Sequence, residues 1–169
     1  MSSAPNSPSS QGRLATGRTL LCVLDDTPEL SVALEFAARR SSRTGAHIGL
    51  LYVIDNAAEF QHWSSVGDLM RAEATEKAER VLKRAAGQVT RWTDEQPTFY
   101  IREGVRRDEV IKQIHEDPSI SFLVLGAATG RDGPGPLVTA LTGRSLGQLH
   151  VPIVIVPGNM SEEEIASFA

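Results

Sequence analysis

The segment whose composition best suits ligand binding is residues 126 to 145, GAATGRDGPGPLVTALTGRS, which holds five glycines and two prolines. It follows the apolar run SISFLVLG, which predicts a buried strand. Loops in this position bind phosphate by aiming backbone N–H groups and a helix N-terminus at the anion. Pro134 and Pro136 each remove one such donor, and glycine also serves plain turns that need positive φ. The residues leave both interpretations open.

Two known phosphate-binding motifs can be compared with this segment. A P-loop needs Gly-Lys-Ser/Thr, and residues 126 to 150 contain no lysine, which excludes a P-loop NTPase. The dinucleotide fingerprint places its glycines after the first strand of a domain, whereas these glycines follow the fourth predicted strand. Any phosphate binding here therefore uses neither motif.

The carboxylates best placed for acid–base chemistry are Asp25 and Asp26, at the end of the first apolar run. Neighbouring side chains usually point apart, and one of the two can instead cap the helix that follows. An acidic pair here also suggests a flavodoxin-like or receiver-like signalling domain. A receiver needs an aspartate after its third strand and a lysine after its fifth, where this chain has Glu103-Gly104 and Pro157-Gly158. These residues disfavour a receiver.

The residue types that most often carry catalysis form no known pattern in this chain. The histidines lack metal-ligand spacing, and no G-x-S-x-G nucleophile motif occurs. Cys22 is the only cysteine, and its apolar neighbours predict a small buried residue. We therefore expect no metal site and no catalytic residue.

Short apolar runs alternate with longer segments of helical period, which predicts a single α/β, Rossmann-like domain. Its five strands would form a parallel sheet with helices on both faces. The predicted strands are residues 19–25, 47–55, 98–104, 119–126 and 151–157, of which 98–104 alternates as an edge strand does. A ligand site in such a sheet lies outside the carboxyl ends of the strands, where the strand order reverses.

Helix boundaries follow from capping residues and breakers. We expect a first helix capped by Thr27, with Pro28 in its first turn and Gly45 at its end. Further helices are expected over residues 66–92, 106–117 and 136–149. Ser161 and Glu164 form a capping box that can start a short terminal helix.

Composition predicts the limits of the domain. Residues 1–18 hold few side chains to bury and predict a disordered tail, residues 19–158 form the domain, and residues 159–169 form a C-terminal tail.

Charge and hydropathy indicate which partners the protein lacks. A net charge of -4 without basic clusters argues against binding of nucleic acid. No apolar run approaches the ~20 residues that span a bilayer, so we expect no membrane association and a cytoplasmic location.

The order of elements, with LDDTPELSVALEFAARRS near the start and VPIVIVPG near the end, resembles the universal stress proteins. The resemblance covers roughly residues 19–158 and implies the strand order 3-2-1-4-5. It places Asp25 at the family aspartate after the first strand and Val53 where the backbone contacts adenine in nucleotide-binding members. Gly104 matches the glycine that follows the family's third strand.

ATP-binding members of this family carry G-x-x-G-x9-G-S/T after the fourth strand. Starting at Gly126, the next glycine, Gly130, comes one residue too late, whereas Gly130, Gly133 and Gly143 fit the spacing. Arg144 then stands where Ser or Thr is expected, and Ser145 comes one place late. Counting back from Pro152 puts Thr139-Ala140 there instead. The resemblance thus implies a degenerate site for ATP or another adenine nucleotide, made by Asp25, Val53, Gly126, Gly130, Gly133, Gly143 and Ser145.

The leading hypothesis for function is a binding and regulatory module of the stress response. The resemblance implies a homodimer through the final strand, whose apolar edge would otherwise be an aggregation hazard. One alternative is a slow ATP hydrolase in the same cleft, with Asp25 helping to place a metal. The other is a protein-interaction domain that binds no nucleotide.

Overall fold

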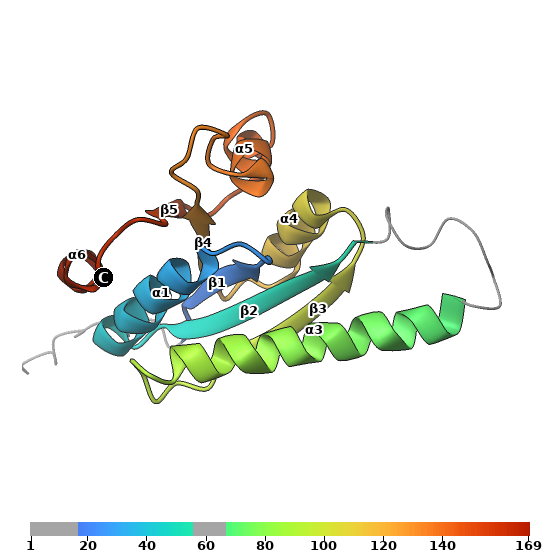
Figure 1. The fold of residues 1–169 in the computed structure, drawn as a ribbon, viewed down its shortest axis with the longest axis horizontal. Helices are drawn as coiled ribbons and strands as arrows, with labels where there is room; N and C mark the ends of the chain where they lie inside the picture. The colour runs from blue at the N-terminus through green and yellow to red at the C-terminus, as the bar shows by residue number, and fades with distance from the viewer. Residues whose placement is uncertain (1–16, 56–66) are drawn as a thin grey trace, which may run out of the picture.

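The computed structural model describes residues 17–55 and 67–169, in which one parallel β-sheet carries helices on both faces (Figure 1). The sheet has the order β3-β2-β1-β4-β5, and every neighbouring pair of strands is parallel. The strands are β1 (Thr19–Leu24), β2 (His47–Ile54), β3 (Thr98–Glu103), β4 (Ile120–Ala127) and β5 (Ile153–Pro157). The predicted α/β fold and the implied strand order are both confirmed.

The helices alternate with the strands along the chain. They are α1 (Leu30–Thr44), α3 (Gly67–Val89), α4 (Arg106–Glu116), α5 (Pro136–Thr142) and α6 (Glu162–Phe168), with one 3-10 turn, η1 (Leu146–Gln148). No helix in these described residues is long and apolar enough to cross a membrane. Most of the predicted N-terminal tail lies outside the described residues.

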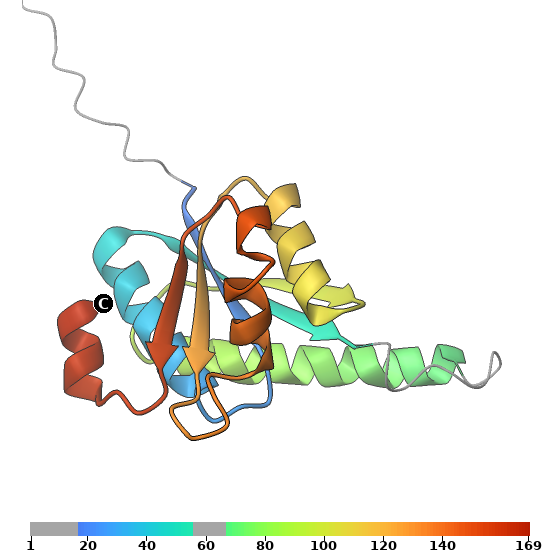
Figure 2. The ribbon, with the colours of Figure 1, turned by 90° about the horizontal axis from the view of Figure 1, so that it is seen from above.

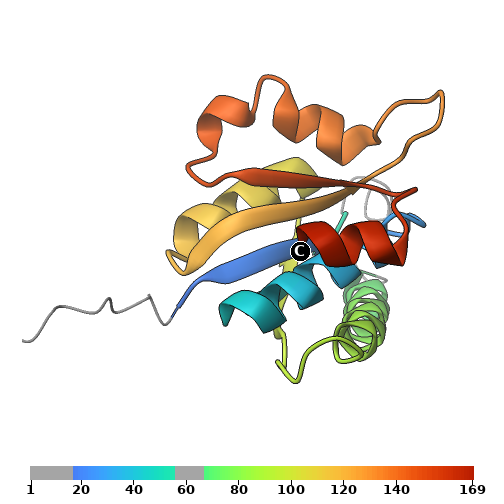
Figure 3. The ribbon, with the colours of Figure 1, turned by 90° about the vertical axis from the view of Figure 1, so that its left-hand side faces the viewer.

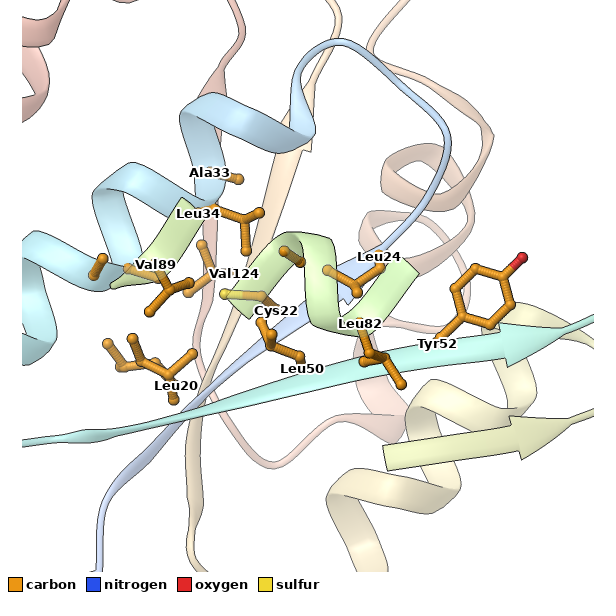
Figure 4. Close-up of a cluster of buried hydrophobic side chains, with 14 of the residues drawn as sticks. Leu20, Cys22, Leu24, Ala33, Leu34, Leu50, Tyr52, Leu82, Val89 and Val124 are labelled. Carbon is orange, nitrogen blue, oxygen red and sulfur yellow. The ribbon is translucent and has the colours of Figure 1, made fainter. Parts of the chain in front are cut away.

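Strand β1 lies in the centre of the sheet, and all six of its residues are buried. Because side chains alternate between the two faces of a strand, Cys22 and Leu24 pack on the side of α1 and α3 (Figure 4). Leu21 and Val23 pack on the side of α4 and α5. Cys22 is 1% exposed, so the predicted buried cysteine is confirmed, and burial raises the pKa of its thiol to about 12.

The prediction that the third strand is an edge strand is also confirmed. Strand β3 lies at one end of the sheet, where Phe99 and Ile101 are exposed. On the long helix α3, the helical period of the sequence predicts Val81 on the inner face. In the structure Val81 is only partly buried, and its neighbour Leu82 is completely buried.

The predicted start of the first helix is wrong. Helix α1 begins at Leu30 with Glu29 as its N-cap, and no side chain caps it. The reason is a competing local turn, in which the Thr27 hydroxyl donates to the Asp25 Oδ1 atom at 2.6 Å. The predicted end holds, since Gly45 adopts the left-handed conformation with φ 69°.

The predicted single helix over residues 136–149 is also wrong. Pro136 does occupy the first turn, but α5 ends at Thr142 and only the short turn η1 follows. Gly143, with φ -86° and ψ -127°, leaves the helical conformation, in keeping with the low helix propensity of glycine. The last strand is shorter than predicted, because pairing with β4 begins at Ile153.

Helix α6 closes the described chain and packs on α1 (Figure 3). Its predicted capping box is present, with the Glu164 N–H donating to Ser161 Oγ at 3.2 Å and the Ser161 N–H donating to Glu164 Oε2 at 2.8 Å. Ile165 is buried, and the Arg43 guanidinium of α1 donates to the carbonyls of Ala166 and Ala169. These contacts fix α6 against the body of the domain.

Candidate functional site

The carboxyl edge of the sheet is the expected position of a ligand site, because the strand order reverses between β1 and β4. The β1–α1 and β4–α5 loops lie beyond the strand ends at this edge (Figure 2). A hollow of about 320 Å³ opens between α1 and α3, with Asp25 and Asp26 in its wall. Two smaller hollows lie nearer the strand ends. We call them the glycine-side hollow, against the β4–α5 loop, and the β2-side hollow, against the end of β2.

The glycine-side hollow has a volume of about 70 Å³. A water molecule in the liquid occupies about 30 Å³, so the space suits one compact group. Its lining residues are Val23, Asp25, Thr27, Glu29, Arg106, Leu125, Gly126, Ala128, Pro134, Gly135, Pro136, Leu137 and Val138.

Backbone packing makes this hollow small. A Cβ atom on Gly126 would lie 2.7 Å from the carbonyl oxygen of Glu29, so the β1–α1 loop sits directly on the glycine. The loop after β4 also closes on itself, because the Ala128 N–H donates to the Pro134 carbonyl at 3.3 Å. Both contacts use up space and donors that a phosphate chain would need.

The β2-side hollow is larger, with a volume of about 160 Å³. Pairing of β1 with β2 ends at Leu24 and Tyr52, so Val53 and Ile54 pair only with β3. The Ile54 carbonyl accepts from the Gly104 N–H at 2.9 Å, so the backbone groups of Val53 point to the opposite side, toward β1. Because β1 ends its pairing at Leu24, the Val53 carbonyl lies past the last paired residue of β1. The lining residues are Asp26, Tyr52, Val53, Ile54, Asp55, Ala74, Lys77 and Arg106.

Arg106 belongs to the walls of both hollows. It is the first residue of α4, and its Nε atom is buried without a hydrogen-bond partner. Within the described residues its guanidinium makes no ion pair either. Leaving a buried donor unsatisfied costs about 1–3 kcal/mol, so this Nε–H needs an acceptor, which a water molecule or a ligand supplies.

An ion network on β3 fixes the helix that carries Arg106. The Arg102 Nε–H donates to Glu109 Oε2 at 2.9 Å, and the same guanidinium donates to Glu116 Oε2 at 2.7 Å. Lys112 also donates to Glu109, whose side chain is 9% exposed. Hydrogen bonds from Lys112 hold the pKa of Glu109 below its usual value despite burial, with those from Arg102 adding to the effect.

The sequence of the chain matches one known protein family over most of its length. The model described as universal stress protein family matches residues 17–157. The chain belongs to the universal stress protein family. No curated protein matches its sequence.

Solved structures share the universal stress protein fold with this chain. Universal stress protein UspA from Lactobacillus plantarum is 17% identical with a TM-score of 0.68, over 84% of this chain and 99% of that one. A universal stress protein in complex with cAMP is 14% identical with a TM-score of 0.59, over 82% and 96%. The protein from Archaeoglobus fulgidus in complex with dAMP is 15% identical with a TM-score of 0.54, over 82% and 97%.

In this universal stress protein, the structure brings part of the predicted site together. Asp25 and Gly126 line the glycine-side hollow, and Val53 lines the β2-side hollow. Asp25 is engaged locally, because its Oδ1 atom accepts from the Thr27 N–H at 3.3 Å as well as from its hydroxyl.

The other predicted site residues lie elsewhere. Gly130 is exposed, and a Cβ atom on Gly133, which has φ 85°, would meet nothing within 4 Å, so both glycines belong to the open loop. Gly143 and Ser145 follow the far end of α5, a helix of 7 residues that spans about 10 Å at about 1.5 Å per residue. Neither lines one of the two hollows.

Arg106, Lys77 and Glu29 are the site residues that sequence reasoning missed. A signal for Arg106 existed, because it stands two residues after Gly104, where a helix begins at the carboxyl edge. Lys77 lies on α3, and the packing of α3 beside β2 brings it to the hollow, which no local pattern records.

Proposed function

We propose that this universal stress protein is a binding and regulatory module of the stress response, which holds an adenine nucleotide with one phosphate group. The observation that carries the proposal is the buried, unpartnered Nε–H of Arg106 between the two hollows. A phosphate oxygen supplies the missing acceptor, and arginine matches the geometry of phosphate with paired donors.

The adenine belongs in the β2-side hollow. The Val53 carbonyl lies beyond the last paired residue of β1 at this hollow, and family members that bind nucleotide contact adenine through the backbone at this position. Tyr52 and Ala74 supply apolar wall, and Lys77 adds a second cation. The related universal stress proteins solved with cAMP and dAMP also hold adenine nucleotides with a single phosphate.

Longer phosphate chains fit the glycine-side hollow poorly. Glu29 and Asp25 bring carboxylates to its wall, and like charges near a phosphate are repulsive. Pro134 and Pro136 lack backbone N–H donors. We therefore expect AMP, dAMP or cAMP to bind more tightly than ATP.

We also propose a homodimer formed through β5. This strand lies at the edge of the sheet, and its Ile155 side chain is 41% exposed. An unpaired, apolar strand edge favours pairing with a second copy of the chain. A cytoplasmic location stays part of this proposal.

Native mass spectrometry of the full-length protein tests nucleotide binding. We expect a mass increase equal to one nucleotide per chain with AMP, dAMP or cAMP, and a smaller bound fraction with ATP. GMP at the same concentration is the control for recognition of the base. An unchanged mass with every adenine nucleotide would contradict the proposal.

A further inference from the structure

A cavity of about 380 Å³ lies near the amino edge of the sheet, opposite the candidate nucleotide site. Its walls come from the C-terminal half of α1, the first parts of β1 and β5, the first half of β4, and the end of α6. We call it the α1–α6 cavity. Pockets that hold small organic ligands have volumes of about 300–1,000 Å³, so this cavity is large enough for one.

The walls of the α1–α6 cavity are mostly apolar. The apolar side chains with the largest surfaces there are Leu20, Phe36, Phe122, Val124, Val154 and Phe168. Leu20 and Val124 belong to the buried core drawn in Figure 4 and form the floor. Phe168 is 68% exposed at the end of α6. An apolar hollow with an aromatic rim favours a ligand with an apolar body.

Two arginines give the cavity a positive side. Arg18 and Arg40 line it and are exposed, and neither guanidinium has a hydrogen bond or ion pair within the described residues. No acidic residue lines the cavity in this part of the chain. The positive charge is a local exception, because the whole chain carries a net charge of -4.

The remaining polar groups of the wall are already satisfied by the protein. The Thr44 hydroxyl donates to the Arg40 carbonyl at 2.7 Å, and the Ser121 hydroxyl donates to the Thr19 carbonyl at 3.4 Å. The two guanidiniums are therefore the polar groups left to recognise a ligand. Since Arg43 anchors α6 to α1, the wall that carries Phe168 is held in place.

We propose that the α1–α6 cavity binds a small amphipathic carboxylate of the medium-chain fatty acid class. The hydrocarbon chain lies against Leu20, Val124 and Val154, and the carboxylate lies between Arg18 and Arg40. Guanidinium and carboxylate pair with matched, bidentate geometry, and the apolar walls exclude a fully polar anion. This site is independent of the proposed nucleotide site, because the two share no lining residue.

Calorimetric titration of the full-length protein with decanoate, below its micelle concentration, tests the proposal. We expect saturable binding of one decanoate per chain and at least tenfold weaker binding of decanol, which lacks the charge. Arg40→Gln should weaken decanoate binding about tenfold, the scale of a lost charge-assisted hydrogen bond. Arg91→Gln removes an exposed arginine elsewhere in the chain and should change nothing.

A second variant tests the position of the hydrocarbon chain. Val154→Phe fills part of the cavity and should reduce decanoate binding, while amide spectra check that the variant folds. Absence of decanoate binding, equal binding of decanol, or full affinity in Arg40→Gln would each overturn the proposal. Capture of anionic phospholipid vesicles without binding of free decanoate would overturn it as well, because the site would then be a membrane surface contact.

Discussion

At the scale of single residues, Arg106 carries most of the proposed function. It begins α4, and the ion network between Arg102 and Glu109 holds that helix against β3. Its buried Nε has no partner among the described residues, although both hollows beside it are open to a ligand. The fold therefore places the Arg106 guanidinium where its Nε–H has no acceptor in the protein, and a bound phosphate would supply one.

Arg106→Gln is the first test at this scale. We expect AMP affinity to fall about tenfold or more, because a hydrogen bond to a charged group contributes about 1.5–3 kcal/mol. Affinity for adenosine, which has no phosphate, should stay within about twofold of its wild-type value. Calorimetry measures both affinities. Arg131→Gln, in the exposed loop after β4, is the matched control. An equal loss of AMP affinity in this variant would show that Arg106 acts only through the net charge of the protein, which would contradict the proposed contact.

Gly126 and Gly130 make a second comparison. Gly126→Ala places a Cβ atom 2.7 Å from the Glu29 carbonyl oxygen, so the β1–α1 loop must move. We expect the free energy of unfolding to fall by about 1–3 kcal/mol, the usual cost of overpacking. Gly130→Ala meets nothing within 4 Å and should change stability little. Urea denaturation measures both, and equal stabilities would show that Gly126 is not a packing residue.

At the scale of elements, the apolar runs of the sequence were enough to predict the five strands, whereas the strand order followed from the family resemblance. The run at residues 19–24 has no polar alternation, as expected for a strand that is covered on both faces, and β1 is buried throughout. The capping box of Ser161 and Glu164 was equally readable, because both of its hydrogen bonds are local. Local patterns were thus sufficient in these two places, where the contacts are close in sequence and no other partner competes for them.

The sequence did not predict features that depend on contacts distant in the chain or on a choice between two competing partners. Thr27 had two possible partners, and its side chain bonds Asp25 and does not cap α1. Glycine spacing suggested a motif from Gly130 to Gly143, yet α5 separates those residues in space. The unpartnered state of Arg106 depends on the packing of several elements, which no local pattern records.

The attachment of α4 to β3 gives a prediction on pH. Hydrogen bonds from Lys112 and Arg102 lower the pKa of Glu109 in the folded protein. The carboxylate therefore stabilises the fold fully above its unfolded pKa of about 4.3, and this stabilisation is lost as the pH falls through the lower folded value. Glu109→Gln should reduce the free energy of unfolding by about 1–3 kcal/mol at pH 7.

Denaturation of wild type and Glu109→Gln across pH 2 to 7 measures the effect. The difference in stability between them should shrink at the acid end of this range. Glu79→Gln alters an exposed pair on α3 and should lie within about 0.5 kcal/mol of wild type. A difference for Glu109→Gln that stays constant with pH would contradict the role given to the charge.

At the scale of the whole molecule, the two edge strands offer a matched test of the proposed dimer. Ile155 of β5 and Ile101 of β3 are similarly exposed, at 41% and 38%. Ile155→Asp should convert a dimer to a monomer in analytical ultracentrifugation, because it places a charge in the paired edge. Ile101→Asp should leave the dimer intact. A wild-type monomer, or dissociation by Ile101→Asp alone, would rule out assembly through β5.

The proposed nucleotide site and the α1–α6 cavity lie at opposite edges of one sheet. The nucleotide site is the central claim, and titration of the labelled full-length protein with AMP, followed by backbone amide NMR, tests it most directly. The predicted result is saturable shifts at Val53, Arg106 and Gly126, with none at Ala46 or Val154. Shifts confined to other residues, or none at all, would contradict the account.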